Sequence, residues 1–166
     1  MELRKRKPLR LEQYDYDSPG CYYITVCTKD RHQILWQPRR LSEMRVGAAF
    51  GRPQLSEIGC VVDAEIQKLN IVYPMINVDK YVIMPNHVHL MIRIASDSGR
   101  PQAAPTLSRI VNQFKGKVSK TIGFSIWQKS YHDHIIRSES DYLRIWEYID
   151  TNPAKWREDR YYEEGL

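Results

Sequence analysis

Cysteine and long apolar runs are both scarce in this chain, and each shortage excludes a class of protein. The three cysteines, Cys21, Cys27 and Cys60, are widely spaced and form no Cys-x-x-Cys pair, so the sequence predicts neither a disulfide framework nor a zinc ribbon. No apolar run approaches the ~20 residues that a membrane-spanning helix needs, and the basic N-terminus has no apolar segment behind it. We therefore expect a cytoplasmic protein that is neither secreted nor embedded in a membrane.

Positive charge exceeds negative charge, and the excess is concentrated at the N-terminus. The formal net charge is +5 and the isoelectric point is near 9.1, which favours a polyanionic partner. The basic residues of this region are Arg4, Lys5, Arg6, Lys7 and Arg10. An arm over residues 1–13 could contact a phosphate backbone or remain solvated, and charge alone leaves both open. Residues 14–166, with an ordinary share of apolar residues, are expected to form a single domain.

Strand-like composition occurs in five segments, namely residues 21–28, 33–36, 78–84, 87–94 and 126–136. Aromatic and β-branched residues dominate the first, which predicts a central strand with residues 33–36 as a short antiparallel partner. Pro85-Asn86 predicts a bend that joins the third and fourth segments.

Three segments predict amphipathic helices. Over residues 55–73 the apolar positions recur at intervals of three to four. Thr106 is the expected N-cap of a basic helix, and Ser140 is the expected N-cap of a last helix that Pro153 should end or kink. This order of elements predicts an α+β fold, a ferredoxin-like sandwich in which helices pack on a central antiparallel sheet.

Two histidines, His87 and His89, lie two residues apart within an apolar, β-branched run. Side chains at i and i+2 of a strand point to the same face, so both imidazoles would converge as metal ligands require. A half-buried strand with two idle histidines has the same pattern. Other residues of the chain are needed to distinguish these two interpretations.

Tyr148 and Asn152 are one turn apart on the predicted last helix. The phenol of Tyr148 could act as a nucleophile, and the amide oxygen of Asn152 could bind a hard cation such as Mg²⁺ or Mn²⁺. The alternative is a core tyrosine followed by a helix end. Tyr131 is a competing nucleophile. The candidate general bases are His132, His134 and Asp150.

The decisive pattern is the combination of two motifs. Met84-Pro85-Asn86-His87-Val88-His89, followed by Tyr148-Ile149-Asp150-Thr151-Asn152-Pro153, resembles the HUH single-strand transposases, in particular the REP-associated tyrosine transposases. The resemblance covers nearly the whole chain. His-x-His alone is unspecific, whereas the two motifs together at this separation are specific.

This resemblance implies an activity and a role for each motif residue. His87, His89 and Asn152 are expected to hold a divalent metal, Mg²⁺ or Mn²⁺. Tyr148 is expected to attack a DNA phosphodiester and form a 5′-phosphotyrosine link. The implied substrate is hairpin DNA with a single-stranded foot, which would associate the protein with the nucleoid. A monomer that uses Tyr148 in cis is favoured over a dimer, and residues 156–162 could fold back or meet a partner.

Further DNA contacts are expected from a basic helix that carries Lys115, Lys117 and Lys120. Two other functions compete with a DNA endonuclease and strand transferase. One is a hairpin-DNA-binding protein without catalysis. The other is a zinc-type metallohydrolase, in which His87, His89 and a carboxylate activate water.

Overall fold

The computed structural model describes residues 18–38, 54–95 and 105–162. The strands are β1 (Gly20–Cys27), β2 (Ile76–Ile83), β3 (His87–Ile94) and β4 (His132–Ile136). The helices are α1 (Glu57–Val72), α2 (Leu107–Ile122), α3 (Glu139–Thr151) and the short 3-10 helices η1 (Lys29–Arg31) and η3 (Asn152–Glu158). None of these helices has the length and apolarity needed to cross a membrane. The predicted basic arm lies outside the described residues.

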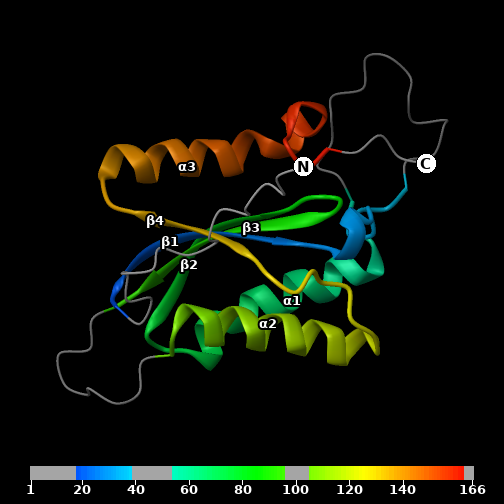
Figure 1. Cartoon of the computed structure of the whole chain (residues 1–166), viewed down its shortest axis with the longest axis horizontal. Helices are drawn as coiled ribbons and strands as arrows, with labels where there is room; N and C mark the ends of the chain where they lie inside the picture. The colour runs from blue at the N-terminus through cyan, green and yellow to red at the C-terminus, as the bar shows by residue number, and fades with distance from the viewer. Residues whose placement is uncertain (1–17, 39–53, 96–104, 163–166) are drawn as a thin grey trace, which may run out of the picture.

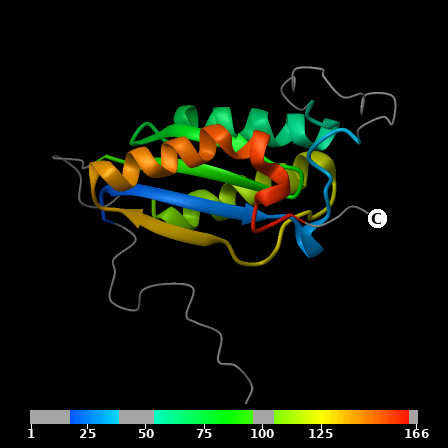
Figure 2. The same ribbon diagram turned by 90° about the horizontal axis from the view of Figure 1, so that it is seen from above.

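The four strands form one antiparallel sheet in the order β2-β3-β1-β4. Because α1 joins β1 to β2 and β3 lies between these two strands, the sheet has the split β-α-β arrangement of ferredoxin-like folds. Helices α1 and α2 cover one face of the sheet, and α3 covers the other (Figure 1 and Figure 2). The predicted α+β sandwich is confirmed, with helices on both faces.

Strand β3 is buried on both of its faces. Leu90 belongs to the main core under α1 and α2, whereas Met91 packs against Ile145 of α3. Alternation along the strand places His87 and His89 on the same face as Met91. The histidines therefore face a helix from a central strand, as the sequence predicted.

The predicted strand over residues 33–36 is wrong. The Leu35 N–H donates to the Pro85 carbonyl at 3.0 Å, and Trp36 forms one isolated bridge rather than a ladder. Both side chains are nevertheless buried, so the apolar pattern comes from a loop that covers the end of the sheet. Helix α1 packs so closely on this loop that a Cβ at Gly59 would lie 2.1 Å from the Leu35 carbonyl oxygen.

The helix ends follow local sequence signals. Thr106 caps α2 as predicted, since its Oγ1 accepts a first-turn N–H at 3.1 Å. Ser138, rather than the predicted Ser140, caps α3, and its Oγ accepts a first-turn N–H at 3.2 Å. Helix α3 ends before Pro153, as expected, and the chain continues in the tighter helix η3.

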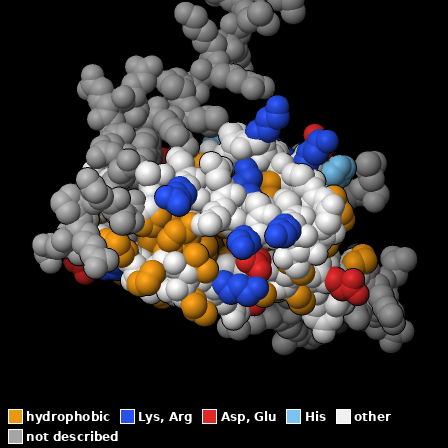
Figure 3. Space-filling view, turned by 90° about the horizontal axis from the view of Figure 1, so that it is seen from below, with side chains coloured by type: hydrophobic (Ala, Val, Ile, Leu, Met, Phe, Trp, Pro, Cys, Tyr) orange, Lys and Arg blue, Asp and Glu red, His pale blue; other side chains and the backbone are white. Residues whose placement is uncertain are grey.

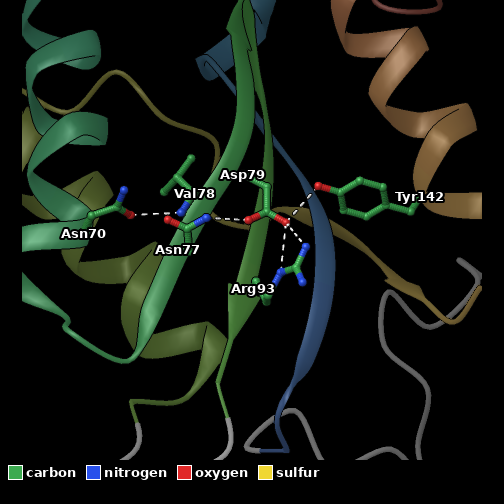
Figure 4. Close-up of polar contacts among 6 residues, drawn as sticks. All are labelled: Asn70, Asn77, Val78, Asp79, Arg93 and Tyr142. Atoms are coloured by element: carbon green, nitrogen blue, oxygen red, sulfur yellow. Dashed lines mark hydrogen bonds and ion pairs between the residues drawn. The ribbon is translucent and has the colours of Figure 1, made fainter. Parts of the chain in front are cut away.

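Asp79 ties β2 to β3 and to α3 (Figure 4). Its carboxylate accepts hydrogen bonds from Nη2 of Arg93 at 2.7 Å, the Tyr142 hydroxyl at 3.0 Å and Nδ2 of Asn77 at 2.5 Å. Burial raises the pKa of Asp79, but these hydrogen bonds, led by that of Arg93, outweigh it and hold the pKa below its ordinary value of 3.8. The ionised carboxylate therefore stabilises the attachment of α3 to the sheet.

We predict that Asp79→Asn lowers the free energy of unfolding by about 1–3 kcal/mol, because it removes charge-assisted bonds from a side chain that is 5% exposed. The folded-state pKa is depressed, so the difference from wild type should be full at neutral pH and shrink below pH 3.8. Urea unfolding measures both effects.

Asp150→Asn is the matched control, because it breaks the ion pair of a 67% exposed carboxylate with Lys80. This substitution should lower the free energy of unfolding by at most about 1 kcal/mol. Equal losses in the two variants would contradict the role given to Asp79.

Candidate functional site

The two histidine side chains converge beneath helix α3. Nε2 of His87 lies 3.0 Å from Nε2 of His89, and the side chains are 0% and 1% exposed. Two ligand atoms bound to one metal ion at ~2.1 Å, with a right angle between the two bonds, would also lie about 3.0 Å apart. The spacing therefore suits neighbouring ligands of one cation.

The other ring nitrogen of each histidine forms hydrogen bonds with neighbouring side chains. Nδ1 of His87 lies 2.8 Å from Oδ1 of Asn86, whose amide nitrogen donates to the Tyr161 carbonyl at 2.9 Å. Nδ1 of His89 lies 2.9 Å from the Thr25 hydroxyl and 2.7 Å from the Tyr23 hydroxyl. Since the Asn86 oxygen can only accept, Nδ1 of His87 carries the proton, and Nε2 of His87 keeps a lone pair for a metal.

Burial keeps both imidazoles neutral. It lowers the pKa of His87 to about 4 and that of His89 well below its ordinary value. A positive neighbour, Arg160, adds to the lowering at both residues. The neutral imidazole is the form that binds metal ions.

Helix α3 and the turn that follows it bring three more polar groups to the histidines. The ring of Tyr148 lies 5.4 Å from that of His89. The Tyr148 hydroxyl and Nδ2 of Asn152 both donate to Oδ2 of Asp159 at 2.9 Å. Tyr148 is 37% exposed, so part of this residue can be reached by a large substrate.

Asn152 has an unused acceptor. The side chain is buried, and its Oδ1 has no hydrogen-bond partner among the residues described. A buried acceptor without a partner is costly unless something binds it. A cation fits this oxygen, since an amide oxygen is a hard ligand.

Asp159 was not predicted from the sequence. One of its carboxylate oxygens and a ring nitrogen of each of His87 and His89 lie within 4.8 Å of one another. Two imidazoles and a carboxylate form a mixed nitrogen and oxygen set that suits a first-row ion such as Mn²⁺ and tolerates Mg²⁺. The sequence signal for Asp159 was only an acid within an aromatic segment.

The segment after Pro153 folds back over the histidines. Tyr161 is 4% exposed, and its ring lies 4.6 Å from that of His87. The ring of Trp156 lies 5.9 Å from His87. Of the two alternatives left open for residues 156–162, the fold-back is the one observed, and it excludes water from the histidine pair.

Comparison with known proteins gives the chain a family. No family model matches it. A Haemophilus influenzae protein described as uncharacterized is 31% identical over 181 aligned residues, which cover 96% of this chain and 94% of the relative. A Haemophilus influenzae protein named as a REP-associated tyrosine transposase is 27% identical over 82 residues, 44% of this chain and 47% of the relative.

A solved structure of a REP-associated tyrosine transposase bound to a REP hairpin aligns with a TM-score of 0.60. It is 21% identical and covers 89% of this chain and 74% of the other. The chain belongs to one family with the first relative and has the REP-associated tyrosine transposase fold. The resemblance seen in the sequence is therefore confirmed.

Within this transposase fold, the competing candidates lie elsewhere or have other partners. Tyr131 is buried in the core under α1 and α2, and its hydroxyl lies 3.2 Å from that of Ser108. Asp150 pairs with Lys80, and His134 pairs with Asp141. His132 and His134 line a hollow that Tyr148 also lines, but the carboxylate that Tyr148 contacts is that of Asp159.

The predicted DNA-binding lysines of α2 lie on the far side of the sheet from Tyr148. Lys117 and Lys120 line a groove between α1 and α2 with Lys68. Figure 3 shows the face of the molecule that these two helices cover, with several Lys and Arg side chains on it. Nζ of Lys115 is instead directed inward and donates to the carbonyls of Gln128 and Lys129. All three remain predictions, as do the basic residues of the arm.

We expect Mn²⁺ to bind the purified protein and to raise its melting temperature, because ligands of the folded state stabilise it. His87→Ala should abolish binding, and Asn152→Ala should weaken it by about 10–100-fold. Titration calorimetry measures the affinities.

His134→Ala removes a histidine outside the cluster and should leave the Mn²⁺ affinity unchanged, which makes it the control. Undiminished Mn²⁺ affinity in His87→Ala would place the ion elsewhere.

Proposed function

We propose that this protein is a divalent-metal-dependent single-strand DNA endonuclease and strand transferase that acts on hairpin DNA through a covalent tyrosine intermediate. The single observation that supports it most is the meeting of Tyr148, Asn152 and Asp159 at the His87–His89 pair. These are a nucleophile, a proton acceptor and a donor set for a cation, contributed by distant parts of the chain.

The chemical step is a transesterification at phosphorus. The Tyr148 oxygen attacks the scissile phosphate, the bond from phosphorus to the 3′-oxygen breaks, and a 5′-phosphotyrosine and a 3′-oxygen result. The phenol proton passes to Asp159, and the 3′-oxygen takes a proton from water to become a 3′-OH. Attack of a 3′-OH on the phosphotyrosine reverses the exchange and joins strands.

Tyr148 needs help to react as a nucleophile. Burial, followed by the hydrogen bond to Asp159, raises its pKa above the ordinary tyrosine value, so the phenol is neutral at neutral pH. Asp159 accepts the Tyr148 hydroxyl at 2.9 Å, within the range required of a general base. A cation bound by His87, His89, Asn152 and Asp159 would polarise the scissile phosphate and offset its developing charge.

The substrate is proposed from the fold. The structural neighbour was solved with a REP hairpin, and the net charge of +5 of this chain suits a nucleic acid. The ring of Tyr148 packs against that of His89 of its own chain, which supports a monomer that uses its nucleophile in cis.

A zinc-type hydrolase is the second candidate, since two histidines and Asp159 could also hold Zn²⁺. Such an enzyme would release product without a protein–DNA adduct and would not need Tyr148. A protein that only binds hairpins would form no adduct and cut no DNA.

Tyr148→Phe is predicted to abolish a covalent adduct with single-stranded hairpin DNA in the presence of Mn²⁺, because it removes the attacking oxygen. Denaturing electrophoresis of labelled DNA measures the adduct. Tyr131→Phe is the matched control and should retain it. An adduct that persists in Tyr148→Phe would overturn the assignment, and cleavage without any adduct would favour the hydrolase.

Asp159→Asn is predicted to slow adduct formation by about 10²–10⁴-fold at saturating Mn²⁺, because the amide cannot accept the phenol proton. Single-turnover kinetics across a Mn²⁺ titration measure the rate and the metal affinity separately. A change in affinity with an unchanged saturated rate would make Asp159 a ligand only.

A further inference from the structure

Two arginines from distant parts of the chain meet at the ring that covers the histidines. The guanidinium carbon of Arg160 lies 4.7 Å from the centre of the Tyr161 ring, and that of Arg31 lies 5.7 Å from it. His87 packs against the same ring at 4.6 Å. Both cations therefore stand beside the proposed metal site.

The backbone that presents Arg31 is strained. Asp30 and Arg31 have φ values of 51° and 54°, the only positive φ values of non-glycine residues in the described ranges. Such conformations are unfavourable for residues other than glycine and persist where the surroundings enforce them, commonly at functional sites. Here the turn η1 directs an arginine toward Tyr161.

Arg160 lines a hollow on the surface together with Thr25, His132 and the proposed nucleophile, Tyr148. No carboxylate among the described residues forms an ion pair with Arg160, whereas Arg93 pairs with Asp79. An exposed guanidinium beside an attacking group can therefore bind an incoming anion without first giving up an ion pair.

The positive charges of the two arginines meet on the side of the hollow that Tyr161 borders. A DNA strand that enters the hollow therefore encounters one guanidinium from η1 and another from the residue after Asp159.

We propose that Arg31 and Arg160 bind a backbone phosphate of the single strand next to the scissile phosphate, and so align the strand for attack by Tyr148. This inference rests on the proposed function. The planar fork of a guanidinium matches phosphate oxygens with paired hydrogen bonds. Neither residue was a candidate from the sequence, since isolated arginines have no recognisable pattern.

Binding of a fluorescent hairpin oligonucleotide with a single-stranded foot, measured by anisotropy in the Tyr148→Phe background, tests the proposal without cleavage. Arg160→Gln and Arg31→Gln should each weaken binding by about 5–20-fold and reduce the slope of log K against log salt by about 0.7. Arg157→Gln removes the same charge from an exposed position of η3 and should leave both unchanged. Thermal melting checks that each variant folds.

A second experiment identifies which phosphate the arginines bind. Each phosphate of the foot is replaced in turn by a neutral methylphosphonate. One position should weaken binding of the parent protein but not of Arg160→Gln, since the variant has already lost that contact. The Arg160→Lys variant should bind the oligonucleotide with an affinity between those of the parent protein and Arg160→Gln, because lysine keeps the positive charge but lacks the planar guanidinium group.

The proposal is overturned if Arg160→Gln binds as Arg157→Gln does, or if no methylphosphonate position couples to either arginine. Failure of the proposed function has a different signature. In that case the wild-type protein forms no adduct, while the effects of both arginines on binding persist.

Discussion

The pairing of β1 with β3 is the constraint on which the candidate site depends. Its register sets Thr25 opposite His89 and Cys27 opposite His87, and this brings the Thr25 hydroxyl to Nδ1 of the imidazole at 2.9 Å. A slip of one residue would turn the histidines into the main core and bring Val88 to α3. The apolar packing that holds the register therefore also aims the two histidines.

Helix α3 supplies the other half of the site, and two contacts of different kinds fix its position. Ile145 and Ile149 pack on Met91 of β3, and the Tyr142 hydroxyl donates to Asp79 of β2. Both anchors lie on the side of α3 that faces the sheet, so they set the rotation of the helix. That rotation directs Tyr148 toward His89 and keeps the residue partly exposed.

Much of the fold could be predicted because it depends on local periodicity. The alternation of β3 and the spacing of three to four in α1 are visible in the sequence, and so is the single-turn separation of Tyr148 and Asn152. The error at residues 33–36 has a physical cause, since a loop that covers the end of the sheet needs apolar side chains as a strand does. The cap of α3 was misplaced by two residues because Ser138 and Ser140 offer the same hydroxyl.

What the sequence could not supply was contact between distant segments. Asp159 and Arg160 follow a 3-10 helix whose direction depends on Pro153 and on the packing of Trp156 against Trp36. No periodic pattern in the sequence predicts that the segment after Pro153 folds back over the histidines. Local patterns therefore locate His87, His89, Tyr148 and Asn152, whereas the groups that would position a proton and a phosphate emerge only from the folded chain.

Asn152 shows why an amide suits the junction between nucleophile and metal. Its Nδ2 donates to the oxygen of Asp159 that also accepts the Tyr148 hydroxyl, while its Oδ1 is buried without a partner in the described structure. A carboxylate in its place would repel Asp159 and could not donate, and an alanine would leave both sides unsupported. Because an amide donates at one end and accepts at the other, one side chain can hold the carboxylate to which the Tyr148 hydroxyl donates and offer an oxygen to a cation at the same time. The proposed nucleophile and the proposed metal centre are thus coupled through a single residue.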